Sequence, residues 1–471
     1  MRLGALIGSG DDSPVTGFAI DHRKVAPGTV FGAFRGDRFN GENFIADAIG
    51  AGAVAVVARP LARVEGAVHI EAEEPRRDFA SLAARFFAPF PKIAVAVTGT
   101  NGKTSTVELC RQLWRMAGHP SASIGTLGVT TSDEQVTTGL TTPDIVTFLS
   151  NMAGLARMGI THAAFEASSH GLSQYRTEGL PVQAAAFTNF TRDHLDYHET
   201  METYFEAKMR LFSEVVEPDG AAVVWTDDPK SEEVARRCIE RGLRVLTVGA
   251  QGDTLKLVAR ETTELGQKLT IEAEGRRHVV TLALIGAYQA ANALTAAGLV
   301  IATGGGLEQT LSNLSRIQPV RGRLERAVIT RAGAPIYVDY AHTADAIESA
   351  IEALRPHTQG RLIIVFGAGG DRDQGKRAGM GEAALRLSDL VIVTDDNPRS
   401  EDPAAIRRDI LKGAPGAREI PGRREAIGAA VAEARDGDII LLAGKGHEQG
   451  QIVGDRILPF DDVTVARECA G

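Results

Sequence analysis

Residues 93–104 have the sequence IAVAVTGTNGKT, which indicates a buried strand, a glycine-containing loop and the start of a helix. Its first half is an unbroken run of β-branched residues and alanines, which is typical of a parallel strand buried on both faces. The glycines that follow let the backbone curl so that N–H groups point at a phosphate, and a helix starting there adds partial positive charge. The stretch predicts a phosphate-binding loop, with Lys103 on the outer phosphates and the Thr104 hydroxyl as a Mg²⁺ ligand.

The sequence on the C-terminal side of this loop predicts a doubly wound parallel sheet. Strand-like runs lie at 163–166, 184–188, 221–225 and 244–248, and helix-like runs lie at 104–116, 145–158, 204–215 and 287–302. Strands that alternate with helices favour a parallel sheet covered on both faces. Residues 254–281 alternate between apolar and polar, and we expect them to add a small antiparallel sheet.

Two further α/β units flank the central one. Prolines at 89 and 91 break the pattern of the first unit, because each disfavours helix at the preceding residue. The sequence QPVRG at 318–322 predicts a hinge or linker, and strand-like runs follow it at 336–338, 362–366, 390–394 and 439–443. We therefore expect an α/β protein of three domains, 1–88, 89–318 and 319–471. The middle one is a doubly wound parallel-sheet ATPase domain, and the last is Rossmann-like.

Composition restricts the class of protein. A formal net charge of −9, without a long Lys/Arg run, argues against a nucleic-acid partner. The three cysteines are an odd number and lack metal-ligand spacing, which suits a reducing compartment. The apolar N-terminal stretch is too short for a signal peptide, and no segment reaches the roughly 18 uncharged apolar residues of a membrane span. We expect a cytoplasmic monomer without membrane insertion.

Three more segments place polar residues beside the predicted phosphate loop. The sequence FEASSHGL at 165–172 puts Glu166 at the end of a buried strand, where a carboxylate is costly unless paired or metal-bound. The sequence TNFTRDHLDYH at 188–198 follows another strand, and Lys208 lies in an apolar helix. Each segment alone has a plain structural explanation. Together they predict one site, because the carboxyl ends of parallel strands face the ligand crevice.

These segments resemble the central domain of the Mur ligases, which build the peptide of bacterial peptidoglycan. The resemblance extends over nearly the whole chain. Further matching motifs are DHR at 21–23, VAPG at 25–28, TTPD at 141–144, VRGRLE at 320–325, VDYAH at 338–342, FGAGGDR at 366–372 and GKGHE at 444–448. The resemblance to the Mur ligases implies a UDP-binding first domain, an ATP-binding catalytic second domain and an amino-acid-binding third domain.

The resemblance also implies a mechanism, in which a carboxylate is activated as an acyl phosphate and joined to an amine. The implied cofactors are ATP, two Mg²⁺ ions and a CO₂-derived carbamate on Lys208. The implied catalytic residues are Lys103, Glu166, His194 and Lys208, and the implied metal ligands are Thr104, Glu166, His194 and carbamylated Lys208. The implied nucleotide positions are Gly99, Thr100, Asn101, Gly102, Lys103, Thr104, Ser105, Asn292, Arg323 and Asp339. The implied positions for a UDP-MurNAc-dipeptide are Ile20, His22, Thr141, Thr142, Ser168, Gln174 and Arg176.

The turn DDNPR at 395–399 matches the signature of the subgroup that adds meso-2,6-diaminopimelate. An Arg399 guanidinium can grip a carboxylate with two parallel hydrogen bonds. L-lysine lacks the far carboxylate and would leave Arg399 unpaired, a mismatch that a polar site can reject by about 10⁴-fold. The implied amino-acid positions are Arg372, Asp396, Asn397, Arg399, Gly444 and Glu448.

Two alternatives stay open. A folylpolyglutamate-synthetase-like ligase shares the ATP loop, the lysine and the chemistry, but segment 21–28 and the DNPR turn argue against it. An inactive homologue that only binds a UDP-sugar belongs to a different class. The intact set Lys103, Glu166, His194 and Lys208 argues against that reading.

Overall fold

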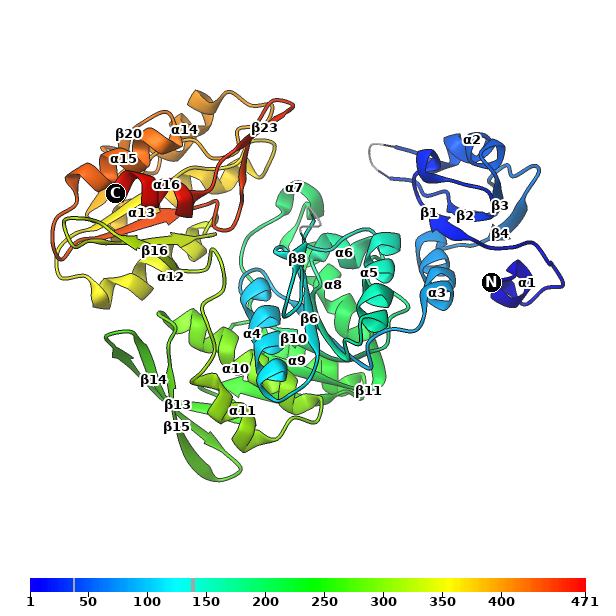
Figure 1. Ribbon diagram of the computed structural model, residues 1–471, viewed down its shortest axis with the longest axis horizontal. Coiled ribbons are helices and arrows are strands. Elements are labelled where there is room, and N and C mark those ends of the chain that lie inside the picture. The colour runs from blue at the N-terminus through cyan, green and yellow to red at the C-terminus, as the bar shows by residue number, and fades with distance from the viewer. Residues whose placement is uncertain (37–38, 137–139) are drawn as a thin grey trace.

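The computed structural model describes residues 1–36, 39–136 and 140–471, and over these residues three β-sheets form the centres of three successive units (Figure 1). The central unit lies below in Figure 1, and the N-terminal and C-terminal units stand apart above its two ends. A small fourth sheet is a hairpin in the C-terminal unit. The expectation of an α/β chain with a central parallel sheet is confirmed.

The N-terminal unit is built on four parallel strands in the order β1-β2-β3-β4. Its strands are β1 (Gly17–Ala19), β2 (Thr29–Gly32), β3 (Ala53–Ala58) and β4 (Val68–Glu71), and its α-helices are α1 (Leu3–Ile7), α2 (Ile45–Gly50) and α3 (Pro75–Phe87). Helix α3 contacts the central unit through α5, so that its Phe79 and Ala80 belong to the same apolar cluster as one face of the central sheet.

The central sheet has the order β15-β14-β13-β12-β11-β10-β5-β9-β6-β7-β8 among the described residues. Its middle, from β12 to β6, is parallel, and β5 lies between β10 and β9. The strands are β5 (Ile93–Thr98), β6 (Ser121–Gly125), β7 (Gly128–Thr130), β8 (Gln135–Val136), β9 (His162–Glu166), β10 (Val182–Phe187), β11 (Val216–Trp225), β12 (Arg244–Gly249), β13 (Leu255–Thr263), β14 (Gly266–Ala273) and β15 (Arg276–Leu282).

Helices cover both faces of this sheet, with α4 and α10 packed together on one face. They are α4 (Lys103–Met116), α5 (Ile145–Arg157), α6 (Ser169–Ser173), α7 (Leu195–His198), α8 (Met201–Arg210), α9 (Ser231–Glu240), α10 (Ala287–Ala302) and α11 (Leu307–Leu314). Helix α5 begins where the Asp144 carboxylate accepts hydrogen bonds from the N–H groups of Val146 and Thr147. Asp144 therefore fixes the start of this helix.

Two expectations about the central unit need correction. Residues 254–281 do form antiparallel hairpins, but they extend the central sheet instead of forming a sheet of their own. The cause is a short parallel pairing of Leu255 and Lys256 with the end of β12. The helix expected at 204–215 ends as an α-helix at Arg210 and continues as one π-helical segment, η3 (Leu211–Val215).

The C-terminal unit has a sheet of order β16-β17-β21-β18-β19-β20, parallel except for the edge strand β16. Its elements are β16 (Glu325–Ile329), β17 (Pro335–Asp339), α12 (Ala344–Leu354), β18 (Leu362–Phe366), α13 (Arg377–Leu387), β19 (Leu390–Val393), α14 (Pro403–Leu411), β20 (Arg418–Glu419), α15 (Arg423–Glu433), β21 (Ile439–Ala443), β22 (Gly450–Val453), β23 (Arg456–Pro459) and α16 (Asp462–Ala470). Apolar clusters on both sheet faces match the Rossmann-like expectation. Across the described part of the chain, every helix is too short or too polar to cross a membrane.

An ion pair inside the C-terminal unit gives a test of its packing. Arg423 of α15 and Asp462 of α16 are both fully buried, and Arg423 NH2 lies 2.6 Å from Asp462 Oδ2. Asp462→Ala leaves a buried guanidinium without its counter-ion and should lower the free energy of unfolding by about 3–5 kcal/mol. Urea denaturation of the variant measures this loss.

The same two helices supply the control. Arg424 and Glu468 form an ion pair of 2.6 Å whose side chains are about half exposed. Because water screens this pair, Glu468→Ala should leave the urea midpoint unchanged. Equal losses for the two alanine variants would show that burial does not determine the strength of these contacts.

Candidate active site

The loop between β5 and α4 is shaped by two glycines in the left-handed region of backbone conformation. Gly99 has φ +145° and Gly102 has φ +86°, and a side chain on either would collide with Thr188 or Asn292. The residues after β10 hold the loop in place: the Asn189 side chain accepts from the N–H of Asn101 at 2.8 Å. The N-terminus of α4 therefore lies open at the end of β5, as a phosphate site requires.

Lys103 at the start of α4 and Lys208 in α8 both donate to one carbonyl oxygen of this loop. Lys103 Nζ donates to the Gly99 carbonyl at 3.0 Å and to the Thr100 carbonyl at 2.8 Å, and Lys208 Nζ donates to the same Gly99 oxygen at 2.7 Å. Neither lysine is ion-paired with any residue that the structure describes. Burial lowers the pKa of Lys208 well below its usual value, and the nearby Lys103 lowers it further. Burial and the neighbouring charge of Lys103 therefore both favour a neutral amine at Lys208.

Glu166 lies at the end of β9, where its side chain is almost completely buried. Its Oε1 accepts from the Thr126 N–H at 2.7 Å, and Oε2 accepts from the Thr126 hydroxyl at 3.2 Å. The Thr126 hydroxyl also meets the Thr141 hydroxyl at 3.1 Å. In the described ranges no lysine or arginine forms an ion pair with Glu166. A buried carboxylate without such a partner is suited to binding a cation.

His194 follows β10 in the left-handed conformation, with φ 55°. Burial lowers the pKa of its imidazole to about 3, against the opposing charge of Asp193. Asp193 Oδ1 lies 3.5 Å from Lys376 Nζ and its Oδ2 lies 3.8 Å from His342 Nε2, both in the C-terminal unit. Although burial opposes it, Lys376 holds the pKa of Asp193 below its usual range. His194 is therefore a neutral imidazole, the form that ligates metals.

The predicted metal ligands suit a cation only when all four contribute. Over the described residues, no three His, Cys, Asp or Glu side chains gather as a metal site. Glu166 supplies one carboxylate, Thr104 a hydroxyl and His194 a neutral nitrogen, so the fourth predicted ligand, Lys208, decides whether the set is anionic enough. As an amine it does not suit Mg²⁺, which prefers oxygen ligands.

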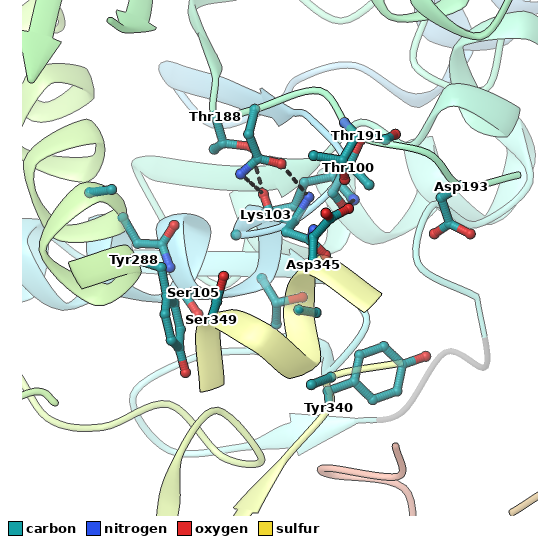
Figure 2. A pocket seen from close by; sticks show the side chains of 18 of the residues that line it. Thr100, Lys103, Ser105, Thr188, Thr191, Asp193, Tyr288, Tyr340, Asp345 and Ser349 are labelled. Atoms are coloured by element: carbon teal, nitrogen blue, oxygen red, sulfur yellow. Dashed lines mark hydrogen bonds between the residues drawn. The ribbon is translucent and has the colours of Figure 1, made fainter. Parts of the chain in front are cut away.

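A cavity of about 500 Å³ opens at these strand ends, between the central and C-terminal units (Figure 2). Figure 2 shows Thr100, Lys103 and Thr188 of the central unit together with Tyr340, Asp345 and Ser349 of the C-terminal unit. The sequence-predicted residues that line it are Thr100, Asn101, Gly102, Lys103, Thr104, Ser105, Thr141, Glu166, Ser168, His194, Lys208, Asn292, Arg323 and Asp339. The nucleotide, metal and catalytic predictions thus converge on one cavity.

The C-terminal wall of the cavity is joined to the loop by Arg323. Its NH2 donates to the Thr104 hydroxyl at 3.0 Å, and its guanidinium lies 4.6 Å from the centre of the Tyr340 ring. Asp339 is held by the Leu324 N–H at 2.7 Å. Opposite, the buried Asn292 Nδ2 has no hydrogen-bond partner among the described residues. An unsatisfied buried donor beside a phosphate loop points to a ligand acceptor.

Four predicted substrate residues form a wall beside Glu166. The Thr142 hydroxyl donates to the Glu166 carbonyl at 2.8 Å and meets the Ser168 hydroxyl at 3.0 Å. Arg176 donates to the Thr142 carbonyl at 2.9 Å and to Gln174 Oε1 at 2.7 Å. Of this group only Ser168 lines the cavity. The other three are joined to one another by the hydrogen bonds of Arg176 and lie outside the cavity lining.

The remaining predicted residues lie outside the cavity. Ile20 and His22 belong to the N-terminal unit, where the His22 ring stacks on Phe44 with centroids 4.3 Å apart. The six predicted amino-acid residues follow β18, β19 and β21 of the C-terminal unit. Arg399 NH1 donates to the Gly370 carbonyl at 2.7 Å, and a side chain on Gly444 would approach Asp396 Oδ2. These residues form a second cluster at the carboxyl edge of the C-terminal sheet.

Sequence reasoning missed several residues of the cavity. Thr126 holds Glu166, while Asp193 and His342 join the two units. Asp193 lies in the TNFTRDHLDYH motif and His342 in the VDYAH motif. For both, the available sequence signal was a polar side chain just after a predicted strand. Thr126 follows β6, at the same edge of the sheet as Glu166, and only the strand order reveals this.

Comparisons with known proteins identify the family. Residues 97–300 match the Mur ligase middle domain, and residues 322–446 match the Mur ligase, glutamate ligase domain. A protein of Zymomonas mobilis named UDP-N-acetylmuramoyl-L-alanyl-D-glutamate--2,6-diaminopimelate ligase is 60% identical, over 97% of this chain and 95% of its own length. The chain belongs to the Mur ligase family. A protein of the same name from Bradyrhizobium diazoefficiens is 50% identical, over 95% and 93% of the two chains.

Solved structures agree with the fold of a Mur ligase. One named for the same 2,6-diaminopimelate ligase superposes with TM-score 0.72 and 31% identity, covering 100% of this chain and 98% of that one. A folylpolyglutamate synthase of Mycobacterium tuberculosis gives TM-score 0.64, but it is 20% identical and covers 78% of this chain. The latter likeness shows a common fold alone, so the folate alternative is the more distant one.

The glycine loop of this Mur ligase gives a second test. Gly102→Ala places a methyl group against the Asn292 side chain at the open end of α4. Because the loop must shift, affinity for ADP should fall by about tenfold or more. Titration calorimetry measures the change.

Gly118, just beyond the other end of α4, is the matched control. It has φ +88°, close to that of Gly102, but an added methyl group would meet no atom within 4 Å. Gly118→Ala carries the same backbone strain without the collision and should bind ADP as wild type does. Unchanged ADP binding by Gly102→Ala would show that this loop is not the phosphate site.

Proposed function

We propose that this Mur ligase joins meso-2,6-diaminopimelate to the D-Glu carboxylate of UDP-MurNAc-L-Ala-D-Glu, with conversion of ATP to ADP and phosphate, in peptidoglycan precursor synthesis. The observation that carries this proposal is the 60% identity, over nearly the full length, to a ligase named for these substrates. The DNPR turn and the phosphate loop in one chain give further support.

The proposed reaction has two steps at the cavity. An oxygen of the D-Glu carboxylate attacks the γ-phosphorus, the bond to the β-phosphate oxygen breaks, and ADP leaves. The amine nitrogen then attacks the acyl phosphate carbon, loses a proton and expels inorganic phosphate. The N-terminus of α4 and Lys103 stabilise the anionic phosphates during the first step.

Magnesium is the implied cofactor, and the cavity residues fit it if Lys208 is carbamylated. When bound, Mg²⁺ would offset the repulsion between the carboxylate and the γ-phosphate. Thr104, Glu166, His194 and modified Lys208 would hold two ions. A neutral Lys208 amine can attack CO₂ and lose a proton to give N–COO⁻. The shared Gly99 carbonyl supports this step, because an ammonium group on the buried Lys208 would be repelled by the adjacent ammonium group of Lys103.

Amino-acid recognition is proposed for the second cluster, on the C-terminal unit. Arg399 and Arg372 would bind the far carboxylate, while Asp396 and Glu448 would bind the far ammonium, with Asn397 holding Glu448 in place. We propose the domain limits 1–88, 89–318 and 319–471, supported by the three sheets. A cytoplasmic monomer is also proposed, because UDP-sugars and ATP are cytoplasmic and one chain supplies both walls of the cavity.

An amino-acid panel tests the proposed function. Purified protein is supplied with ATP, Mg²⁺ and UDP-MurNAc-L-Ala-D-Glu, and phosphate release is measured with each amino acid. Meso-diaminopimelate should exceed L-lysine in kcat/KM by about 10⁴-fold, because L-lysine leaves Arg399 unpaired. Release with a folate and L-glutamate instead would favour the synthetase alternative. No release with any amino acid would favour the inactive UDP-sugar-binding homologue.

The proposed carbamate gives a prediction for Lys208. Lys208→Ala removes the fourth ligand, so turnover should fall by about 10²–10³-fold, and acetate should restore part of it by supplying a carboxylate. Lys208 Nζ lies 4.4 Å from the centroid of the Tyr204 ring, and Lys230 Nζ lies 4.7 Å from that of Phe205 but is partly exposed and outside the cavity, so Lys230→Ala is the control. Full activity of Lys208→Ala without acetate would remove the carbamate from the mechanism.

A further inference from the structure

Lys445, in the loop after β21, is completely buried and takes no part in the mechanism above. Its Nζ donates to Asn397 Oδ1 at 3.1 Å, to Glu448 Oε2 at 3.1 Å and to the Gly450 carbonyl at 2.7 Å. An ammonium group has three N–H donors, and each has an acceptor here. Two of the three acceptors belong to residues of the proposed amino-acid site.

These contacts fix the orientation of the Asn397 amide. Oδ1 accepts from Lys445 and from the Ile452 N–H at 2.9 Å, so the nitrogen must lie on the other side. There Nδ2 donates to Glu448 Oε2 at 2.7 Å. Asn397 is nearly buried and cannot reverse its amide without losing all three hydrogen bonds.

The same contacts leave the two oxygens of Glu448 unequal. Oε2 accepts from both Lys445 and Asn397, whereas Oε1 accepts no hydrogen bond from the described residues. The Glu448 side chain is 29% exposed, while Lys445 is 0% exposed. One carboxylate oxygen is therefore anchored inward, and the other stays available to a ligand cation.

We propose that Lys445 is a positioning residue that sets specificity for the far ammonium of the amino acid. It anchors Glu448, directly and through Asn397, so that the free carboxylate oxygen of Glu448 keeps a fixed place next to the Asp396–Asn397 turn. The inference rests on the proposed function, since it concerns the same amino-acid site. A ligand charge is bound best by groups that need no rearrangement, so a fixed Glu448 favours a substrate ammonium.

Charge supports a positioning role. Asp396 is nearly buried at the same edge, and its Oδ1 accepts from the Asn397 N–H at 2.6 Å. Two carboxylates close together would repel each other without a cation between them and the protein interior. Lys445 supplies a cation to Glu448 from the interior side, which leaves the open side for the substrate. By contrast, the buried Arg423–Asp462 pair has no oxygen that reaches solvent.

Steady-state kinetics of Lys445→Met tests the proposal in the full-length enzyme. The KM for meso-diaminopimelate should rise by about 10- to 100-fold, the effect of losing hydrogen bonds to charged groups. The KM for ATP and for UDP-MurNAc-L-Ala-D-Glu should change by less than about twofold, because neither substrate meets this cluster. Lys445→Gln, which keeps amide donors, is the second variant if Lys445→Met fails to fold.

Lys412→Met is the matched control. Lys412 forms an ion pair of 2.7 Å with Asp409, three residues away, as Lys445 does with Glu448, but its side chain is 71% exposed. Its three KM values should equal those of wild type. In a Glu448→Gln background, Lys445→Met should add less than about threefold to the KM for diaminopimelate, since both changes remove one interaction.

The outcomes separate this proposal from the proposed function. If wild type does not ligate diaminopimelate, the proposed function fails. If wild type does, but a folded Lys445 variant keeps its KM, the positioning role is wrong. Equal increases in all three KM values, or full additivity with Glu448→Gln, would show that Lys445 only stabilises the fold and would overturn the proposal.

Discussion

Two lysine side chains that end on one carbonyl oxygen determine what the cleft can do. Lys103 and Lys208 both donate to the Gly99 carbonyl, and the Lys208 side chain is buried there. Two ammonium groups cannot share such a place without strong repulsion, so one amine is held neutral. A neutral buried amine is a nucleophile, and in our proposal CO₂ converts it into the anion that completes a cation site with Glu166 and His194.

Strand direction in the central sheet and contacts with the C-terminal unit build the rest of this cavity. Parallel strands direct their carboxyl ends to one edge, and the central sheet brings the phosphate loop, Glu166 and His194 to that edge. The C-terminal unit closes the cavity through Arg323 on Thr104 and through Lys376 on Asp193. Each contact pairs a cation of the C-terminal unit with an acceptor of the central unit.

The sequence predicted the features that depend on neighbouring residues. The strand-loop-helix at 93–116, Glu166 at a strand end and the Rossmann-like C-terminal strands are local patterns, and the structure has them. Features set by distant contacts were not predictable. The antiparallel hairpins join the central sheet because Leu255 pairs with Val248, and Thr126 reaches Glu166 only through the strand order. Lys445 lies in the GKGHE motif at 444–448, but its burial and its hydrogen-bond partners could be known only from the three-dimensional structure.

Carbon NMR of the protein equilibrated with isotope-labelled bicarbonate detects a carbamate on Lys208 directly. Wild type should give a carbamate resonance that disappears in Lys208→Met, because the methionine keeps the shape of the side chain but has no amine. The Lys230→Met variant should keep the resonance. A wild-type spectrum without a carbamate resonance, or a resonance that survives in Lys208→Met, would contradict the account.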